Sequence, residues 1–236
     1  PELSLDFYRK EGYHPAAVRE YLLTILNSNY EEWRIENPDA PAEDFRFSTE
    51  KMSSSGALFD LDKLNDVSKN ALLHIDAHEL AGWLKSWSDE YAPEYDYVFR
   101  DMDHLAQILD LGRHDARPRA DLVYAKQIMD FIGYFFDEAF EIKDGYPAEA
   151  AADADAIIRS YLDSYDHSDD NEQWFGKIRQ IAVDMGYAAK PKDYKKNPDD
   201  YKGHVGHVST VIRIALMGRA QSPDVWAIQQ ILGEDM

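Results

Sequence analysis

A serine-rich stretch that begins at Lys51, KMSSSGALFD (51–60), has the composition of a loop that handles phosphate groups. Such a loop works by placing two ammonium groups, on its first and fourth residues, beside the charge that develops on a leaving pyrophosphate. Lys51 supplies the first group, but Ser54 stands in the fourth place, so half of the positive charge is missing. A working site would also need a nucleotide-binding α/β domain with a helix N-terminus for the phosphates, and no such pattern is present. We therefore predict no catalytic residue in this chain.

Patterns that could bind a metal ion are also incomplete. The chain has no cysteine, which excludes thiolate ligands, disulfide bonds and a cysteine nucleophile. His74 and His78 share a helical spacing but lack a third ligand, and the same holds for His204 and His207. The acidic run DSYDHSDDNE (163–172) lacks the glycine and the spacing of a calcium loop. We predict no metal site.

Positive charge is concentrated in one stretch of an otherwise acidic protein. The formal net charge of −20 argues against a general binder of polyanions. Residues 176–219 nevertheless carry nine Lys and Arg against four Asp and Glu. Lysines in this stretch suit a phosphate backbone, and the tyrosines between them could stack on bases; they are Lys190, Lys192, Lys195, Lys196 and Lys202, with Tyr187, Tyr194 and Tyr201. A solvated lysine loop without a ligand is an equal alternative.

Helical periodicity runs through nearly the whole chain. Apolar residues recur at helical spacing in many stripes, for example Val18, Tyr21, Leu22, Ile25 and Leu26, and no alternating strand pattern or β-α-β spacing is found. We predict an all-α protein. Pro, Gly and Asp clusters near residues 90 and 145 interrupt the helices. They divide the chain into three parts, residues 1–90, 91–145 and 146–236. No run of about 18 apolar residues and no signal-peptide pattern occurs, so we expect a cytoplasmic protein that does not enter a membrane.

Four segments together resemble one known family, the bacterial glutamyl-tRNA synthetases of class I. They are FYRKEGYHPAAVREYLLTIL (7–26), KMSSSGALFDLDKLNDVSKNAL (51–72), ARPRADLV (116–123) and VIRIALMGRAQSPDVWAIQQILG (211–233). The second resembles a non-catalytic element of the family that follows the true catalytic lysines, and the last resembles the family's ending. By this resemblance the chain is the C-terminal portion of such an enzyme, and Pro1 would begin just past the catalytic lysine loop.

The resemblance implies a function in tRNA recognition. Residues 1–90 would be a helical remnant of the stem-contact region, and 91–145 and 146–236 would be two helical anticodon-binding modules. Base-reading roles would fall on Arg119, Arg179, Arg213, Thr210, Ser222, Pro223 and Val225. The parent enzyme would join glutamate to tRNA(Glu) with ATP and Mg²⁺, whereas this portion would hold no cofactor and be inactive alone.

The same resemblance sets the expected partners. They are tRNA(Glu) and the catalytic domain of the same chain; DNA is not expected, and the protein would be a monomer. A glutaminyl-tRNA synthetase fits less well, because the resemblance is to helical modules rather than to β-barrels. The competing hypothesis is an all-helical protein-interaction module that does not bind tRNA.

Overall fold

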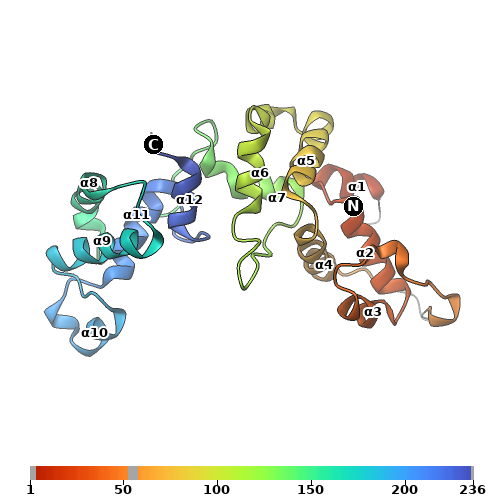
Figure 1. Ribbon diagram of the computed structural model, residues 1–236, viewed down its shortest axis with the longest axis horizontal. Helices are drawn as coiled ribbons and strands as arrows, with labels where there is room; N and C mark the ends of the chain where they lie inside the picture. Colours follow the sequence, from red (N-terminus) through yellow and green to blue (C-terminus); the bar gives the residue numbers. More distant parts are fainter. Residues whose placement is uncertain (1–3, 53–57, 235–236) are drawn as a thin grey trace. The chain divides into compact units, whose positions relative to one another are not determined.

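The computed structural model describes residues 4–52 and 58–234, and helices account for its regular structure (Figure 1). Within these ranges no strand forms, and one isolated bridge joins Ala188 and His204. The predicted all-α fold is confirmed. By packing, the chain divides into two units, Pro1–Ile132 and Gly133–Met236. The predicted division at residues 90 and 145 concerns functional regions and stays a prediction.

Unit 1 is a set of short helices connected by turns and 3₁₀ segments. Its elements are α1 (Leu5–Glu11), α2 (Pro15–Leu26), α3 (Tyr30–Glu36), η1 (Ala42–Asp44), η2 (Thr49–Lys51), α4 (Leu61–Leu73), α5 (Ala77–Tyr91), η3 (Pro93–Phe99), α6 (Met102–Asp110) and α7 (Ala125–Ile132). Helix starts follow ordinary capping chemistry, as where the Asp60 carboxylate accepts a hydrogen bond from the N–H of Lys63 at 3.1 Å. Helices α2 and α4 pack together, as do α5 and α6.

The core of unit 1 is aromatic where α2 meets α4. Tyr13, Tyr21, Leu64 and Val123 form a buried cluster there. At the end of α1, Gly12 has a positive φ of 81°, and a Cβ atom at this position would collide with Ala125. The carbonyl of Gly12 accepts a hydrogen bond from the N–H of Ala125 at 2.7 Å, which ties α1 to the start of α7.

The apolar stripe predicted along α2 is only partly buried. Tyr21 is 2% exposed, but Leu22 and Leu26 are 44% and 36% exposed. These two leucines lie on a face of α2 that no described residue covers well, although helical periodicity alone would place them in a core. The spacing of apolar residues therefore predicted the helix correctly, but only some of these residues are buried.

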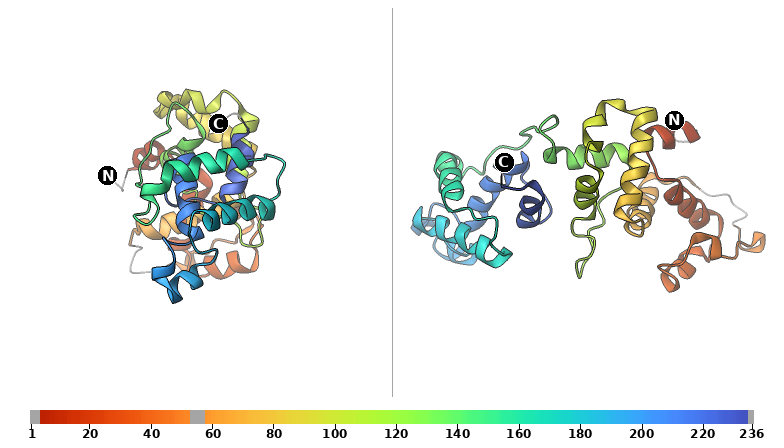
Figure 2. Two further views of the ribbon diagram at one scale, coloured as in Figure 1. Left: turned by 90° about the vertical axis from the view of Figure 1, so that its left-hand side faces the viewer. Right: turned by 45° about the horizontal axis from the view of Figure 1, so that its top comes forward.

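Unit 2 contains η4 (Gly133–Phe135), η5 (Ala151–Asp153), α8 (Ala154–Ser164), α9 (Asn171–Asp184), α10 (Pro191–Lys196), η6 (Pro198–Asp200), α11 (Val205–Met217) and α12 (Val225–Leu232). Helices α8, α9 and α11 pack on one another (Figures 1 and 2). Tyr161 of α8 connects them to α12: its hydroxyl accepts from the indole N–H of Trp174 at 2.9 Å and donates to the Gln229 side chain.

None of the helices in the described part of the chain is long and apolar enough to cross a membrane.

Candidate nucleic-acid interface

The connection between α11 and α12 is held in one shape by a distant segment of unit 2. Gly218 ends α11 with a φ of 68°, and a Cβ atom there would collide with the carbonyl of Glu141. The Gly218 carbonyl accepts hydrogen bonds from the backbone N–H groups of Lys143 and Asp144 at 2.8 and 3.1 Å. The Asp144 carboxylate in turn accepts from the N–H of Ala220 at 2.7 Å. Residues 141–144 therefore fix the backbone that carries Ser222, Pro223 and Val225.

Sequence reasoning did not single out Asp144 or Gly218. A glycine after a helical pattern is an available signal for a helix end. The pairing of that end with residues 141–144 has no signal in the sequence, because the two segments are about 75 residues apart.

Arg213 belongs to this connection. It lies on α11, and its Nη1 donates to the carbonyl of Ala220 at 3.1 Å. Its Nε–H is buried and has no hydrogen-bond partner among the described residues. Burial lowers the pKa of Arg213, and the neighbouring Asp224 opposes this. The guanidinium is thus positioned by one carbonyl and keeps donor capacity that the described part of the protein does not use.

The other predicted residues of this stretch differ in what they offer a ligand. Thr210 lies one helical turn before Arg213, but its hydroxyl donates to the Gly206 carbonyl at 2.8 Å. Ser222 and Pro223 are half-buried, and the Ser222 hydroxyl donates to the Pro223 carbonyl at 2.8 Å. Val225 is 5% exposed, so its side chain packs in the core. Any contact of Val225 with a base would have to use its backbone.

Arg179 lies on a different helix, α9. It is exposed, and its guanidinium carbon stands 5.2 Å from the centre of the Phe175 ring, one turn earlier on the same helix. The ring supports the long side chain without occupying its hydrogen-bond donors. This arrangement leaves the planar fork of Arg179 available for a base or a phosphate.

Arg119 belongs to unit 1 and is already engaged by its neighbours. Its Nε donates to the Asp121 carboxylate at 2.7 Å, and its Nη1 donates to the Leu111 carbonyl at 3.2 Å. The guanidinium carbon lies 4.6 Å from the centre of the Phe131 ring, and the side chain is 13% exposed. Reading a base with Arg119 would therefore use its remaining donors or displace Asp121.

The basic stretch folds as a short helix whose lysines are exposed. Lys190 caps α10 (Pro191–Lys196), and the other lysines lie on α10 or after it. All five predicted lysines are exposed: Lys190, Lys192, Lys195, Lys196 and Lys202. Among these, Lys202 pairs with Asp153 at 2.8 Å.

The tyrosines of this stretch do not form the predicted stacking row. Tyr187 is 2% exposed, and its hydroxyl donates to the Asp153 carboxylate at 2.8 Å. The prediction that Tyr187 stacks on bases is therefore wrong, because its ring belongs to the core. Tyr194 packs against the rings of His204 and His207, and Tyr201 is half-buried.

The histidine pairs are used in other ways. His74 lies 3.5 Å from Asp39, and His78 lies 3.2 Å from Asp103. His204 and His207 cap α11, each accepting a backbone N–H with its Nδ1. Within the described ranges no group of three or more His, Asp or Glu is placed to hold a metal ion. Lys51 ends η2, and Ser54 lies outside the described residues.

No family model matches the chain. A glutamate–tRNA ligase of Acetivibrio thermocellus is 60% identical over 237 residues, which cover 100% of this chain and 43% of the relative. A glutamate–tRNA ligase of Clostridium perfringens is 39% identical over 241 residues, with 100% and 44% covered. The one from Sorangium cellulosum is 34% identical over 238 residues, with 99% and 42% covered. The chain thus spans less than half the length of these relatives.

A solved structure resembles the fold. The crystal structure of a glutamate tRNA ligase from Elizabethkingia meningosepticum, in complex with its amino acid, superposes with a TM-score of 0.57 at 19% identity. The match covers 96% of this chain and 40% of that one. At this identity the likeness concerns the fold alone.

Proposed function

Because this chain is related along its whole length to the C-terminal part of glutamate–tRNA ligases, we propose that it is the tRNA-recognition region of such an enzyme. The observation that carries the proposal is 60% identity to one of these ligases over all of the chain. The whole enzyme would attach glutamate to tRNA(Glu) in the cytoplasm, using ATP and Mg²⁺ bound by its catalytic domain. This region alone would bind tRNA and form no glutamyl-adenylate.

Recognition of the anticodon would centre on the connection between α11 and α12. Unpaired anticodon bases present their hydrogen-bonding edges, and arginine forks and backbone groups read such edges. Support comes from Arg213, whose guanidinium donates to the Ala220 carbonyl through Nη1, and from the backbone that Asp144 holds at Ala220, just before Ser222 and Pro223. Arg179 on α9 would add a second guanidinium. Thr210 and Val225 would contribute through atoms close to the backbone that connects α11 and α12. Arg119 would read a base only with donors that Asp121 leaves free.

The exposed lysines of the α10 region would contact phosphates rather than bases. Point charges on long side chains add affinity and carry no sequence information. Lys192, Lys195 and Lys196 suit this role because they are exposed on α10. Lys190 at the cap would join them, whereas Lys202 would first have to leave Asp153.

The catalytic domain of the same protein would cover exposed apolar side chains of unit 1. Among the described residues from α2 to the start of α4, seven large apolar side chains are at least 36% exposed: Leu22, Leu26, Ile35, Phe47, Met52, Leu58 and Leu61. Exposed apolar surface of this kind marks contacts with other proteins or domains. An intramolecular contact would leave the enzyme a monomer.

Binding of tRNA to the chain tests the proposal. We expect tRNA(Glu) to bind more tightly than the same tRNA with a substituted anticodon, measured by filter binding at several salt concentrations. The triple variant Lys192→Gln/Lys195→Gln/Lys196→Gln should weaken both tRNAs equally. It should also flatten the slope of log K against log salt by about two, since each phosphate contact to a single strand contributes about 0.7.

The matched control is Lys63→Gln/Lys69→Gln/Lys85→Gln, three lysines of unit 1 that pair with acidic side chains. It changes the net charge by the same amount and should leave the slope nearly unchanged. Affinity that ignores the anticodon, or no binding at all, would favour the protein-interaction module instead. ATP–pyrophosphate exchange above background would contradict the absence of an adenylate site.

A further inference from the structure

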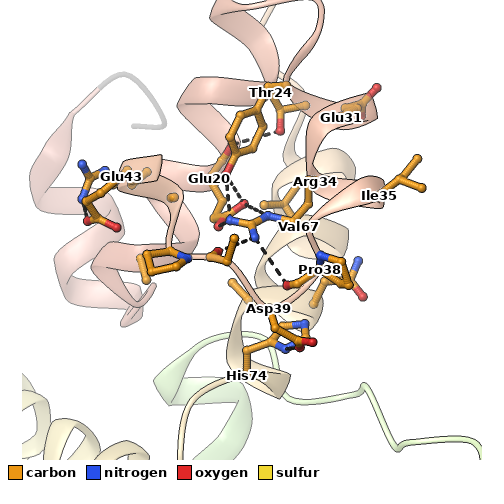
Figure 3. A pocket seen from close by; sticks show the side chains of 18 of the residues that line it. Glu20, Thr24, Glu31, Arg34, Ile35, Pro38, Asp39, Glu43, Val67 and His74 are labelled. Carbon is orange, nitrogen blue, oxygen red and sulfur yellow. Dashed lines mark hydrogen bonds and ion pairs between the residues drawn. The ribbon is translucent and has the colours of Figure 1, made fainter. Parts of the chain in front are cut away.

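Unit 1 contains a pocket of about 800 Å³ whose lining includes none of the side chains proposed above to contact tRNA (Figure 3). It lies between one face of α2, the helix α3, the connection around residues 38–43, and α4. Figure 3 shows Asp39 and His74 side by side at one end, Thr24 and Glu31 at the other, and Arg34 between them. A volume of this size lies in the range of small-molecule sites.

One wall of the pocket is rigid because Arg34 is saturated with hydrogen bonds. Its Nη1 donates to the carbonyls of Asn37 and Ala40 at 3.0 and 2.6 Å, which holds the connection in place. Its Nε and Nη2 donate to the Glu20 carboxylate, which also accepts from the Tyr30 hydroxyl at 2.5 Å. The network is electrically balanced and has no donor to spare, so it shapes the pocket without binding a ligand.

The opposite wall is α4 with the turn that follows it, and it presents two neighbouring rows. Val67 and Ala71 stand four residues apart on α4, and Ile75 in the turn after the helix extends this apolar row of small and medium side chains. Asp66, Asn70 and His74 stand one residue earlier in each case and form a polar row beside it. A ligand that lies along α4 would therefore meet an apolar surface and a polar surface together over two helical turns.

Negative charge is in excess around the pocket. Five carboxylates and three permanent cations line it. The cations pair with Glu20, Glu31 and Glu43. The remaining carboxylates, Asp39 and Asp66, have side chains 89% and 69% exposed. Their present partners are His74 at 3.5 Å and Lys69 at 3.1 Å, and such exposed pairs contribute little free energy. A ligand cation can therefore replace them.

The two available carboxylates lie toward opposite ends of the pocket. Asp39 contacts His74 at the end of α4, and Asp66 lies next to Lys63, which bonds to Glu31 at the other end. Eight residues separate Asp66 from His74, which is about 12 Å of helical rise. The matching ligand has two cations about this far apart with an apolar chain between them.

We propose that this pocket binds a linear aliphatic polyamine. Its methylene chain would lie on Val67, Ala71 and Ile75, and its terminal ammonium groups would donate to Asp66 and Asp39. Asn70 offers a side-chain oxygen between them for an internal amine. This site does not depend on the proposed tRNA function, and its test contains no nucleic acid.

Calorimetric titration of the chain with α,ω-diaminooctane, spermidine and α,ω-diaminobutane tests the proposal. The two diamines carry the same charge, but only the longer one can reach both carboxylates. We expect diaminooctane and spermidine to bind with one molecule per chain, and diaminobutane to bind at least about fivefold more weakly. That factor corresponds to one lost attraction between unit charges about 4 Å apart in water. Neutral octanediol should not bind measurably.

Two variants locate the site. Asp39→Asn/Asp66→Asn should weaken diaminooctane at least about fivefold. Asp155→Asn/Asp163→Asn changes two exposed acids of unit 2 and the same net charge, and should leave the affinity unchanged. Circular dichroism melting checks that each variant is folded; if the first is not, Ala71→Leu, which narrows the pocket at constant charge, takes its place. Equal affinity for both diamines, or equal weakening by the control variant, would overturn the proposal.

Discussion

Replacing Arg213 with methionine keeps an unbranched side chain in place and removes the guanidinium. Two effects on stability then oppose each other. The variant loses a hydrogen bond from a charged donor to the Ala220 carbonyl, which contributes about 1.5–3 kcal/mol. It also removes a buried Nε–H without a partner, whose desolvation costs about 1–3 kcal/mol. We expect the free energy of unfolding to change by no more than about 1 kcal/mol.

Binding should respond differently. If Arg213 donates to an anticodon base, the variant should lose about 1–3 kcal/mol of discrimination between matched and substituted anticodons. The measurements are urea unfolding of the variant, followed by filter binding of both tRNAs. The two together separate a residue that reads RNA from one that supports the fold.

Arg113→Met is the matched comparison. Arg113 is 8% exposed, and its Nη2 donates to three carbonyls at the end of α4, those of Leu72, Leu73 and Ile75, at 2.6–2.7 Å. Its loss removes three hydrogen bonds from a charged donor, each contributing about 1.5–3 kcal/mol. It also removes the buried Nη1, which has no partner among the described residues and whose desolvation costs about 1–3 kcal/mol. The three lost bonds outweigh this gain, so the variant should cost about 3 kcal/mol. If Arg213→Met is as destabilising as Arg113→Met and leaves anticodon preference intact, Arg213 is a structural residue and the reasoning fails.

Three further changes have expected outcomes. Burial lowers the pKa of His14 to about 4, below the unfolded value of about 6.5. The free energy of unfolding should therefore fall as the pH drops from about 6.5 to 4, by at most about 3 kcal/mol, and less in His14→Asn, as followed by urea unfolding. Gly218→Ala should cost more than about 1 kcal/mol because of its positive φ and the nearby backbone; Gly145→Ala, with open space around it, should stay within about 0.5 kcal/mol. Tyr161→Phe leaves its buried partners on α9 and α12 unpaired and should lower the free energy of unfolding by about 1–3 kcal/mol in the same assay.

The sequence determined the class of fold and the relationship to a family. Helical spacing of apolar residues, as in α5 with Leu80 and Leu84 both buried, depends on neighbours three and four residues away and is visible in one dimension. The four motifs that resemble glutamyl-tRNA synthetases are likewise local strings. The lysine motif that begins at Lys51 could be judged incomplete without any structure, because that judgement needs only the number of lysines in the motif.

Tertiary structure decided which side chains are free to act. Tyr187 and Tyr194 stand in the same basic stretch of the sequence. Tyr187 is buried in the core, whereas the ring of Tyr194 packs against the ring of His207. Arg119 and Arg213 both follow patterns of the family, but Asp121 occupies the first, and the second keeps a donor without a partner. Exposure and partners depend on contacts between segments far apart in the chain.

The pocket of unit 1 is also formed by contacts between segments that lie far apart in the chain. Its walls come from α2, α3, the connection after α3, and α4, so no contiguous stretch of sequence contains it. Arg34 shapes it through carbonyl groups, which every residue has and which no sequence pattern reveals. Local periodicity fixes the helices because their hydrogen bonds are local. The arrangement of charges around a cavity is set only when those helices pack.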